Sequence, residues 1–410
     1  MIVFCRERLA ETTRLRRWGK LSRDAFRGSS QVWKSFSNLR SLVHSTGVPP
    51  AQNTVNYAPK KFIFSFKSTH WTGNIELMHL LVSRGIFAVV LLTLLCGCRP
   101  PRDAGDHGSA TTKSELHFAV IPKGESHIFW QSVRSGAQQA GEDLGVRVTF
   151  KGPSKESDRS EQISVFQSFL NSGVDGICLA PLDADALVRP VEEAGRAGVP
   201  VVIFDSGLNT DSGDFVSYVA TDNFRGGQMA ADAMASSLGA DGGKVICLRY
   251  HQGSESTHQR EEGFLDGIAK YPQIEVISSD QYGGTTTESA VDKSQSLLNR
   301  FGTDVDGVFT TCEPNAEGML RAIRDRDLAG KVKLIAFDSS DSLREALAAG
   351  DVSAIVLQDP VRMGYLAIET LAAAIRGESV ESFVDTGLFV ATPDNLTDET
   401  IARLLNPSRE

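Results

Sequence analysis

The feature of this 410-residue chain that most restricts its fold is an internal repeat. Three blocks of sequence recur in the same order and at nearly one spacing. They are VDG at 174–176 and 305–307, VIFDS at 202–206 with IAFDS at 335–339, and the helix-like stretches 136–150 and 263–277. Such matches predict two similar lobes rather than one long domain.

Within both predicted lobes, short apolar runs alternate with amphipathic helical stretches. Runs of this length, bounded by Gly, Pro or Asp, are typical of strands buried on both faces. Their alternation with helices predicts an α/β fold in which each lobe is a doubly wound parallel sheet. The predicted strands are 116-LHFAVIP, 146-VRVTFKG, 176-GICLAP, 200-PVVIFD, 243-GKVICLRY, 274-IEVISSD, 307-GVFTTCE, 332-VKLIAFD and 353-SAIVLQD.

Charge is divided unevenly along the chain. Residues 1–98 carry 14 Lys and Arg against 4 Asp and Glu, whereas the whole chain carries 42 and 51, so the remainder is strongly acidic. An acidic surface repels a phosphate backbone, which argues against nucleic acid as a partner.

An apolar run from Ile86 to Leu95 follows the basic Arg84 and is too short to cross a membrane as a helix. We interpret residues 78–98 as a secretory signal. Its end, LCGC, resembles the lipobox of bacterial lipoproteins, with Cys98 as the lipid-bearing residue. The Pro-, Gly- and Ser-rich stretch 99–114 would then be a flexible tether. A plain signal peptide or a fortuitous apolar run is the alternative interpretation.

A secretory signal acts only near the beginning of a chain, yet 77 residues precede Met78. They are basic and show no sustained helical or strand period. Our hypothesis is that translation starts at Met78 and that 1–77 is a disordered, non-native upstream extension.

Sequence motifs for catalysis and metal binding are absent. The six cysteines have no CxxC or other metal-binding spacing, and no HExxH motif or recognisable nucleophile motif occurs. We therefore expect no metal, no cofactor and no enzymatic activity.

Polar residues that directly follow the apolar runs are the candidates for a binding site, because ligands of doubly wound sheets lie beyond the carboxyl ends of the strands. Asp205 and Asp338 end matching runs in the two lobes. Either alone could simply cap the next helix, but the matched pair favours a cleft between the lobes that closes on a small ligand. The polar candidates are Asp205, Arg260, Glu313, Asp338 and Gln358, with Asn223 beside the hinge.

These side chains offer both hydrogen-bond donors and acceptors. A carboxylate or a guanidinium can hold two neighbouring hydroxyls at once. Because each hydroxyl buried without a partner is costly, a site this rich in polar groups suits a polyhydroxylated ligand.

Phe129 and Trp130 lie where the first predicted strand passes into a helix. An indole face there could support the C–H face of a sugar ring. Apolar residues follow both at helical spacing, so the alternative is that one or both continue the core stripe of the helix. Lys123 and His127, in the preceding loop, are weaker candidates, because such loop residues are most often solvated.

From about Leu116 to its end the sequence resembles the ribose-binding type of periplasmic sugar-binding protein, the solute receptors of ABC importers, which share their fold with the effector domains of LacI-type repressors. The blocks that carry the resemblance are 129-FWQSVRSGAQQA, 179-LAPLDADAL, 199-VPVVIFDS, 219-VATDNFRGGQMAA, 260-REEGF, 335-IAFDSSD and 357-LQDPVRMGYLA.

The resemblance implies a three-crossover hinge, with crossings near Asp222, Asp359 and Gly387. The N-terminal lobe would comprise 115–222 with 359–387, and the C-terminal lobe 223–358 with 388–410. It further implies an aromatic sandwich at Phe129 and Trp130 and ligand-binding groups at Asp205, Arg260, Asp338 and Gln358.

This sequence departs from the ribose-binding pattern. His127, Ala180 and Cys312 stand where ribose binders have Asn, with Glu313 next to Cys312, and Ser206 stands where they have Arg. We keep Ser206 as a candidate ligand-binding residue. Such changes in the hydrogen-bonding groups predict a different monosaccharide, a sugar derivative or a furanosyl signal molecule.

The expected function is that of a monomeric solute-binding lipoprotein in the periplasm or cell envelope. It would capture the sugar or polyol by hinge closure, deliver it to the membrane subunits of an ABC importer and touch the membrane only through its lipid. A sugar receptor for chemotaxis or for a sensor kinase is an alternative. A LacI-type regulator is less favoured, because its DNA-reading module would occupy the place of the apolar signal.

Overall fold

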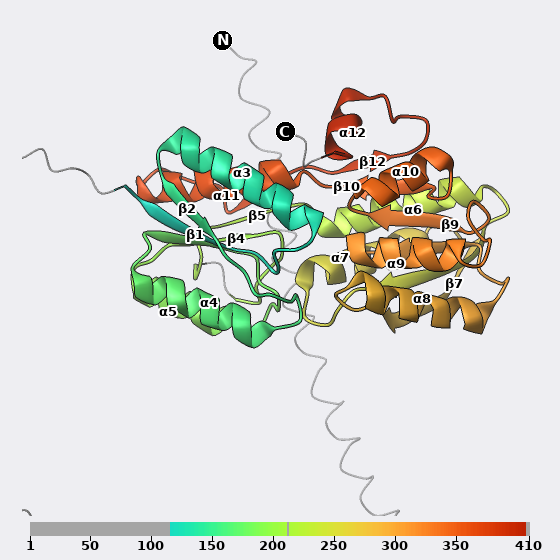
Figure 1. Cartoon of the computed structure of the whole chain (residues 1–410), viewed down its shortest axis with the longest axis horizontal. Helices are drawn as coiled ribbons and strands as arrows, with labels where there is room; N and C mark the ends of the chain where they lie inside the picture. Colours follow the sequence, from blue (N-terminus) through green and yellow to red (C-terminus); the bar gives the residue numbers. More distant parts are fainter. Residues whose placement is uncertain (1–114, 211–212, 407–410) are drawn as a thin grey trace, which may run out of the picture. The chain divides into compact units, whose positions relative to one another are not determined.

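The computed structural model describes residues 115–210 and 213–406. The predicted extension 1–77, the signal 78–98 with Cys98, and the tether 99–114 lie outside these residues. The described part contains two α/β lobes, each built on a six-stranded sheet (Figure 1).

The first lobe holds a sheet with the strand order β11-β5-β4-β3-β1-β2, and all its strand pairs are parallel. Its strands are β1 (His117–Ile121), β2 (Arg147–Phe150), β3 (Gly176–Leu179), β4 (Val201–Phe204), β5 (Ser217–Ala220) and β11 (Phe383–Asp385). Its helices are α3 (Ile128–Leu144), α4 (Arg159–Ser172), α5 (Val188–Arg196) and α11 (Pro360–Ile375).

The second lobe repeats this order as β12-β10-β9-β8-β6-β7. Its strands are β6 (Gly243–Arg249), β7 (Ile274–Tyr282), β8 (Gly307–Thr310), β9 (Lys333–Phe337), β10 (Ala354–Leu357) and β12 (Phe389–Ala391). Its helices are α6 (Asn223–Leu238), α7 (Glu255–Ile268), α8 (Thr287–Phe301), α9 (Glu313–Arg324), α10 (Asp341–Ala349) and α12 (Glu399–Leu404). The equal strand order confirms the two similar lobes predicted from the repeat.

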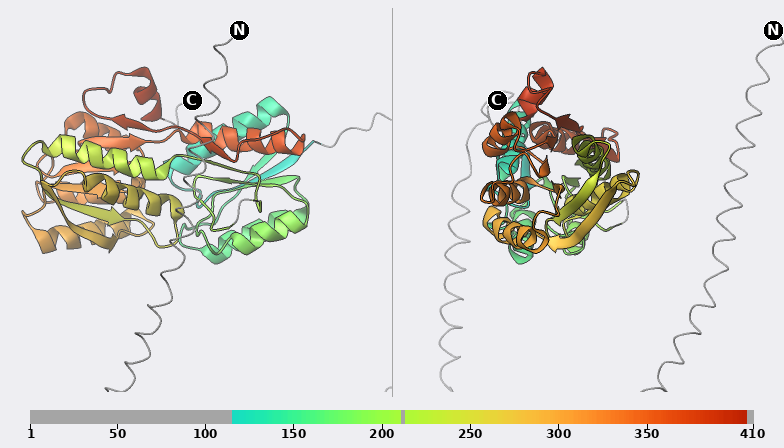
Figure 2. Two further views of the ribbon diagram at one scale, coloured as in Figure 1. Left: turned by 180° about the vertical axis from the view of Figure 1, so that it is seen from behind. Right: turned by 90° about the vertical axis from the view of Figure 1, so that its right-hand side faces the viewer.

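Both sheets are covered by helices on both faces, as the continuous apolar strands predict. In β1, Phe118 and Val120 pack with α3 and α11, whereas Ala119 and Ile121 face α4 and α5. In the second lobe, α8, α9 and α10 cover one face and α6 and α7 cover the other (Figure 2).

Each of the nine apolar runs contains a strand, but three short strands were missed. β5 carries the polar Ser217 among its four residues, and β11 and β12 have three residues each, too few for a pattern. β12 also runs antiparallel to β10. The second sheet is therefore mixed, whereas the sequence predicted a wholly parallel sheet.

The chain passes between the lobes three times. The crossings lie between β5 and α6, between β10 and α11, and between β11 and β12. Asp222 and Asp359 are the N-caps of α6 and α11, and each accepts a backbone hydrogen bond from the first turn of its helix.

Helices α6 and α7 approach each other through glycines. A Cβ atom on Gly227 would lie 2.1 Å from the carbonyl oxygen of Arg260, and one on Gly263 would lie 2.0 Å from that of Phe224. Any residue larger than glycine at either of these two positions would push the helices apart. Gly227 and Gly263 therefore permit the close packing of α6 and α7, and this packing fixes the backbone that carries Arg260.

None of the helices among residues 115–210 and 213–406 combines the length and the apolar character required to cross a bilayer.

Candidate functional site

The carboxyl ends of the strands of both lobes surround a cavity. Nine of the eleven sequence-predicted residues line it: Lys123, His127, Phe129, Trp130, Asp205, Arg260, Glu313, Asp338 and Gln358. The lining is completed by Glu156, Tyr250, Ser256, Thr257, Cys312 and Pro314.

Asp205 and Asp338 occupy equivalent positions, one residue after β4 and one residue after β9. Both have left-handed backbone conformations, with φ of 60° and 68°, which non-glycine residues seldom adopt. Each therefore carries backbone strain at the same point of its lobe, and both carboxylates belong to the wall of one cavity. Strain of this kind is common where a side chain must be held at a binding site.

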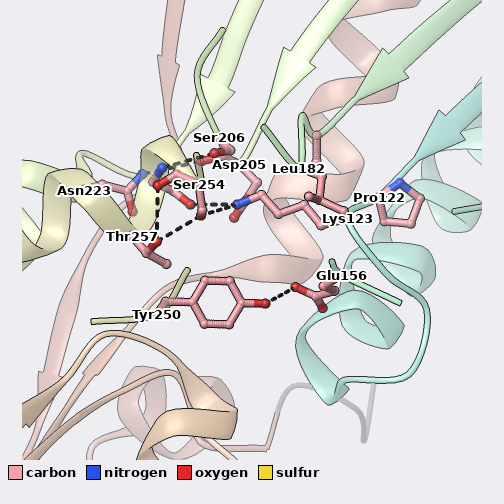
Figure 3. A network of polar contacts seen from close by, with 12 residues as sticks. Pro122, Lys123, Glu156, Leu182, Asp205, Ser206, Asn223, Tyr250, Ser254 and Thr257 are labelled. Carbon is pink, nitrogen blue, oxygen red and sulfur yellow. Dashed lines mark hydrogen bonds and ion pairs between the residues drawn. The ribbon is translucent and has the colours of Figure 1, made fainter. Parts of the chain in front are cut away.

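Lys123 is buried, with 4% of its surface exposed, so the alternative of a solvated loop lysine is wrong, and Lys123 stays a candidate for binding. Its Nζ lies 2.9 Å from Oδ2 of Asp205. It also donates to the hydroxyls of Ser254 (3.3 Å) and Ser256 (2.9 Å) in the opposite lobe (Figure 3). One ammonium group thus joins the carboxylate of the first lobe to the start of α7 in the second.

The guanidinium of Arg260 contacts four neighbouring residues. Its Nε donates to Oδ1 of Asn223 (2.8 Å) and its Nη1 to the backbone oxygen of Thr311 (2.9 Å). Nη1 also lies 3.5 Å from Oδ2 of Asp338, and the guanidinium carbon stands 3.9 Å from the ring centroid of Phe337. A guanidinium fixed in this way presents its remaining donors in one direction, which suits the recognition of hydroxyls.

The aromatic pair is arranged differently from the expected sandwich. The rings of Phe129 and Trp130 touch edge to face, with centroids 4.8 Å apart and planes 84° apart, so no ligand ring fits between them. Trp130 is only 3% exposed and packs against Val133 and Phe204. Trp130 belongs to the core, as the alternative interpretation predicted, and it also lines the cavity. Its role as a platform for a ligand ring stays a prediction.

The carboxylate of Glu156 contacts three other side chains of the cavity. Its Oε1 accepts from Nε1 of Trp130 (2.6 Å) and lies 2.8 Å from Nδ1 of His127, while Oε2 accepts from the hydroxyl of Tyr250 (2.6 Å). The contact with Tyr250 crosses between the lobes (Figure 3). Both carboxylate oxygens are thus used by the protein itself.

The electrostatics around Glu156 favour a charged pair with His127. Burial alone would raise the pKa of Glu156, but the hydrogen bonds and charge of His127, with the bonds from Tyr250 and Trp130, hold the pKa below its usual range. Burial opposes charge on His127 as well, yet Glu156 raises the imidazole pKa above its ordinary value. The pair contributes a positive and a negative group side by side.

Glu313 and Gln358 each have a polar atom with neither a hydrogen-bond partner nor an ion-pair partner. Oδ2 of Asp205 also accepts no hydrogen bond, but it lies 2.9 Å from Nζ of Lys123. Oε2 of Glu313 and Oε1 of Gln358 are buried and have no hydrogen-bond partner. Burial raises the pKa of Glu313 to about 7 in spite of nearby His127, and burial also raises the pKa of Asp338 in spite of Arg260. Buried acceptors without donors are costly, so these atoms are ready to accept hydrogen bonds from a ligand.

Ser206 and Asn223 do not line the cavity. The hydroxyl of Ser206 accepts from the backbone N–H of Ser256 (3.1 Å), and Asn223 donates to the backbone oxygen of Asp205 (3.4 Å) while accepting from Arg260. Both are buried and position cavity residues across the lobe boundary.

Some lining residues missed from the sequence had a usable signal. Tyr250 ends the predicted strand 243–250, where the rule of strand ends applies, and Ser256 precedes Arg260 by four residues, on the same face of α7. Glu156 had no such signal, because it lies in a loop several residues beyond β2.

Among the residues that the structure describes, no group of three or more His, Cys, Asp or Glu side chains is arranged to hold a metal ion. The three cysteines in this part, Cys178, Cys247 and Cys312, are buried free thiols. Burial raises the pKa of each. These cysteines are therefore poor nucleophiles.

Comparison with known proteins agrees with this architecture. A family model described as a periplasmic binding protein domain matches residues 118–379. The D-allose-binding periplasmic protein of Escherichia coli is 27% identical over 66% of this chain and 88% of its own length. The ribose import binding protein RbsB of Haemophilus influenzae is 29% identical, over 69% of this chain and 92% of its own.

Solved structures give the same result. A carbohydrate transporter solute-binding protein from Agrobacterium radiobacter, in complex with D-arabinose, aligns with a TM-score of 0.69 and 35% identity, over 72% of this chain and all of its own. An ABC transporter solute-binding protein from Agrobacterium vitis, with bound D-fucose, gives a TM-score of 0.68 and 35% identity, over 70% and 99%.

Proposed function

Because the chain belongs to the periplasmic binding protein family, we propose that it captures a monosaccharide or a similar polyhydroxylated small molecule between its lobes and delivers it to an ABC importer. The relatives include proteins named for ribose and allose, and the neighbouring structures hold D-arabinose and D-fucose. The observation that carries the proposal is the buried cavity lined by charged and amide groups of both lobes.

In this proposal the lobes comprise 115–222 with 359–387 and 223–358 with 388–410, and they turn about the three crossings. Closure brings the strand ends of both sheets to the ligand, which is then bound from two sides. The chain acts as a receptor and not as an enzyme, so the bound sugar is released unchanged.

The experiment for this function is a thermal-shift screen of the purified protein against pentoses, hexoses, polyols and nucleosides. A ligand that binds only the folded state raises the melting temperature. We expect a shift with at least one sugar or polyol and recovery of that compound unchanged. No shift across the whole panel, or conversion of the sugar, would contradict the proposal.

Closure should depend on Tyr250, whose hydroxyl donates to Glu156 across the lobe boundary. In Tyr250→Phe, Oε2 of Glu156 loses its donor in the closed form, at a cost of about 1.5 to 3 kcal/mol. We therefore expect the sugar found in the screen to bind about tenfold more weakly or worse, measured by titration calorimetry.

The matched control is Tyr271→Phe, since the hydroxyl of Tyr271 also contacts a carboxylate, Asp232, but within the second lobe (2.9 Å). This variant should bind the sugar like the parent. Equal affinities for Tyr250→Phe and the parent would show that the Glu156 contact does not assist closure.

We further propose that the protein is a monomer held at the cell envelope by a lipid on Cys98. Relatives named as periplasmic support an extracytoplasmic location. The expected result is that cells fed a labelled fatty acid incorporate the label into the parent chain and not into Cys98→Ser. Equal labelling of both would exclude this anchor.

A further inference from the structure

The charged groups of the cavity pair off almost completely. Three of its four carboxyl groups each lie beside one cationic side chain. The pairs are Lys123–Asp205 (2.9 Å), His127–Glu156 (2.8 Å) and Arg260–Asp338 (3.5 Å). Glu313 is the fourth carboxyl group, and within the described residues no ion pair joins it to a cation.

Glu313 is fixed at the first position of α9, directly after Cys312. Its side chain is buried, with 9% of the residue exposed, and Oε2 has no hydrogen-bond partner. The backbone N–H of Phe129 donates to the Glu313 carboxylate, which lowers the pKa of Glu313. Burial thus isolates an acidic group on the cavity wall with one oxygen unused.

A second unused acceptor belongs to the same region. Gln358 donates its Nε2 to Oδ1 of Asp338 (2.7 Å), which leaves Oε1 without a partner. Asp338 also accepts a hydrogen bond from the backbone of Glu313. The two unused atoms therefore belong to residues that flank Asp338, and both are acceptors only.

We propose, building on the proposed sugar-binding function, that the ligand is an amino sugar or an amino polyol whose protonated amine is held by Glu313. An ammonium group carries three donors and no acceptor, so it matches a set of unused acceptors. It also supplies the positive charge that pairs with the fourth carboxylate. A hydroxyl supplies one donor and no charge, so the ionised form of Glu313 would have no counter-ion beside it.

The titration of Glu313 supports the same assignment. Three charged groups face it: His127 from the loop before α3, Asp338 after β9 and Glu317 along α9. Burial dominates and places the pKa of Glu313 at about 7. Because the ammonium binds the ionised carboxylate, affinity for an amino sugar should rise from about pH 5.5 to about pH 7, where most amines are still protonated.

The test compares matched ligands by titration calorimetry on the full-length protein. The pairs are D-glucosamine with D-glucose, D-galactosamine with D-galactose and D-mannosamine with D-mannose, and the N-acetyl derivatives keep the nitrogen but lose the charge. We expect at least one amine to bind about tenfold more tightly than both its hydroxyl and its N-acetyl partner. The preference should increase with pH over the stated window.

Glu313→Gln keeps the size and one acceptor of the side chain but removes its charge, so it should abolish the amine preference and the pH trend together. Glu317→Gln is the matched control, because Glu317 lies on the same helix, outside the cavity lining, and accepts from the hydroxyl of Ser340. It should keep the preference, with the pH trend shifted to lower pH, because Glu317 raises the pKa of Glu313. Thermal unfolding of both variants checks that they fold.

The outcomes separate this inference from the proposed function. Neutral sugars that bind as tightly as their amines, or an amine preference that survives in Glu313→Gln, would overturn the role of Glu313 and leave a sugar receptor. If none of these compounds nor any in the thermal-shift panel bound, both proposals would fail.

Discussion

Replacing Arg260 with alanine is expected to lower the free energy of unfolding by about 3 to 5 kcal/mol, because it leaves Asp338 as a buried charge without its cation. Arg260 is 2% exposed, and its guanidinium also holds Asn223 and the backbone of Thr311. Sugar binding should weaken by about 30-fold or more, about 2 kcal/mol. Urea unfolding and titration calorimetry measure the two effects.

Arg249→Ala is the control for this variant. Arg249 forms an ion pair with Glu261 (2.9 Å) in the same lobe but does not line the cavity. The Arg249→Ala variant should be less stable than the parent and should bind the sugar with the same affinity. If Arg260→Ala and Arg249→Ala bound the sugar equally well, Arg260 would be a structural residue only.

Replacing Trp130 with alanine should also lower the free energy of unfolding by about 3 to 5 kcal/mol, the usual cost of removing a large buried aromatic side chain. The indole packs in the core of the first lobe, so the variant does not leave the fold untouched. The sugar should bind much more weakly as well, because Nε1 no longer orients Glu156. Both quantities can be followed in one thermal-shift titration.

Two further variants separate the roles of Trp130. Trp130→Phe keeps a ring but removes the donor to Glu156, so it should lose affinity with a smaller loss of stability. Phe204→Leu alters the core behind the indole without touching the cavity, so it should lose stability alone. An unchanged affinity in both Trp130 variants would remove Trp130 from the binding site.

The repeat made the fold predictable. A doubly wound lobe needs buried strands, and their apolar runs ended at the positions that face the cavity, as Asp205 and Asp338 do. The charged partners were harder to foresee. Lys123 is buried because Asp205 of its own lobe and Ser256 of the other lobe surround it, and neither contact is local in sequence.

Loop residues were the least predictable part of the site. Glu156 reaches the cavity through the path of the loop after β2, and only the folded chain places it beside Tyr250. The indole of Trp130 meets the rings of Phe129 and Phe204 edge to face, and the residues next to Trp130 in the sequence do not determine this packing. Sequence identified the strand ends, and tertiary packing decided which side chains meet there.

The most direct measurement of the central claim is a crystal structure of the protein with the compound that gives the largest thermal shift. We expect the ligand in the cavity between the lobes, with donors within hydrogen-bond distance of Oε2 of Glu313 and Oε1 of Gln358. A ligand bound outside this cavity, for example in the groove beside Tyr282 and Lys293, would contradict the account.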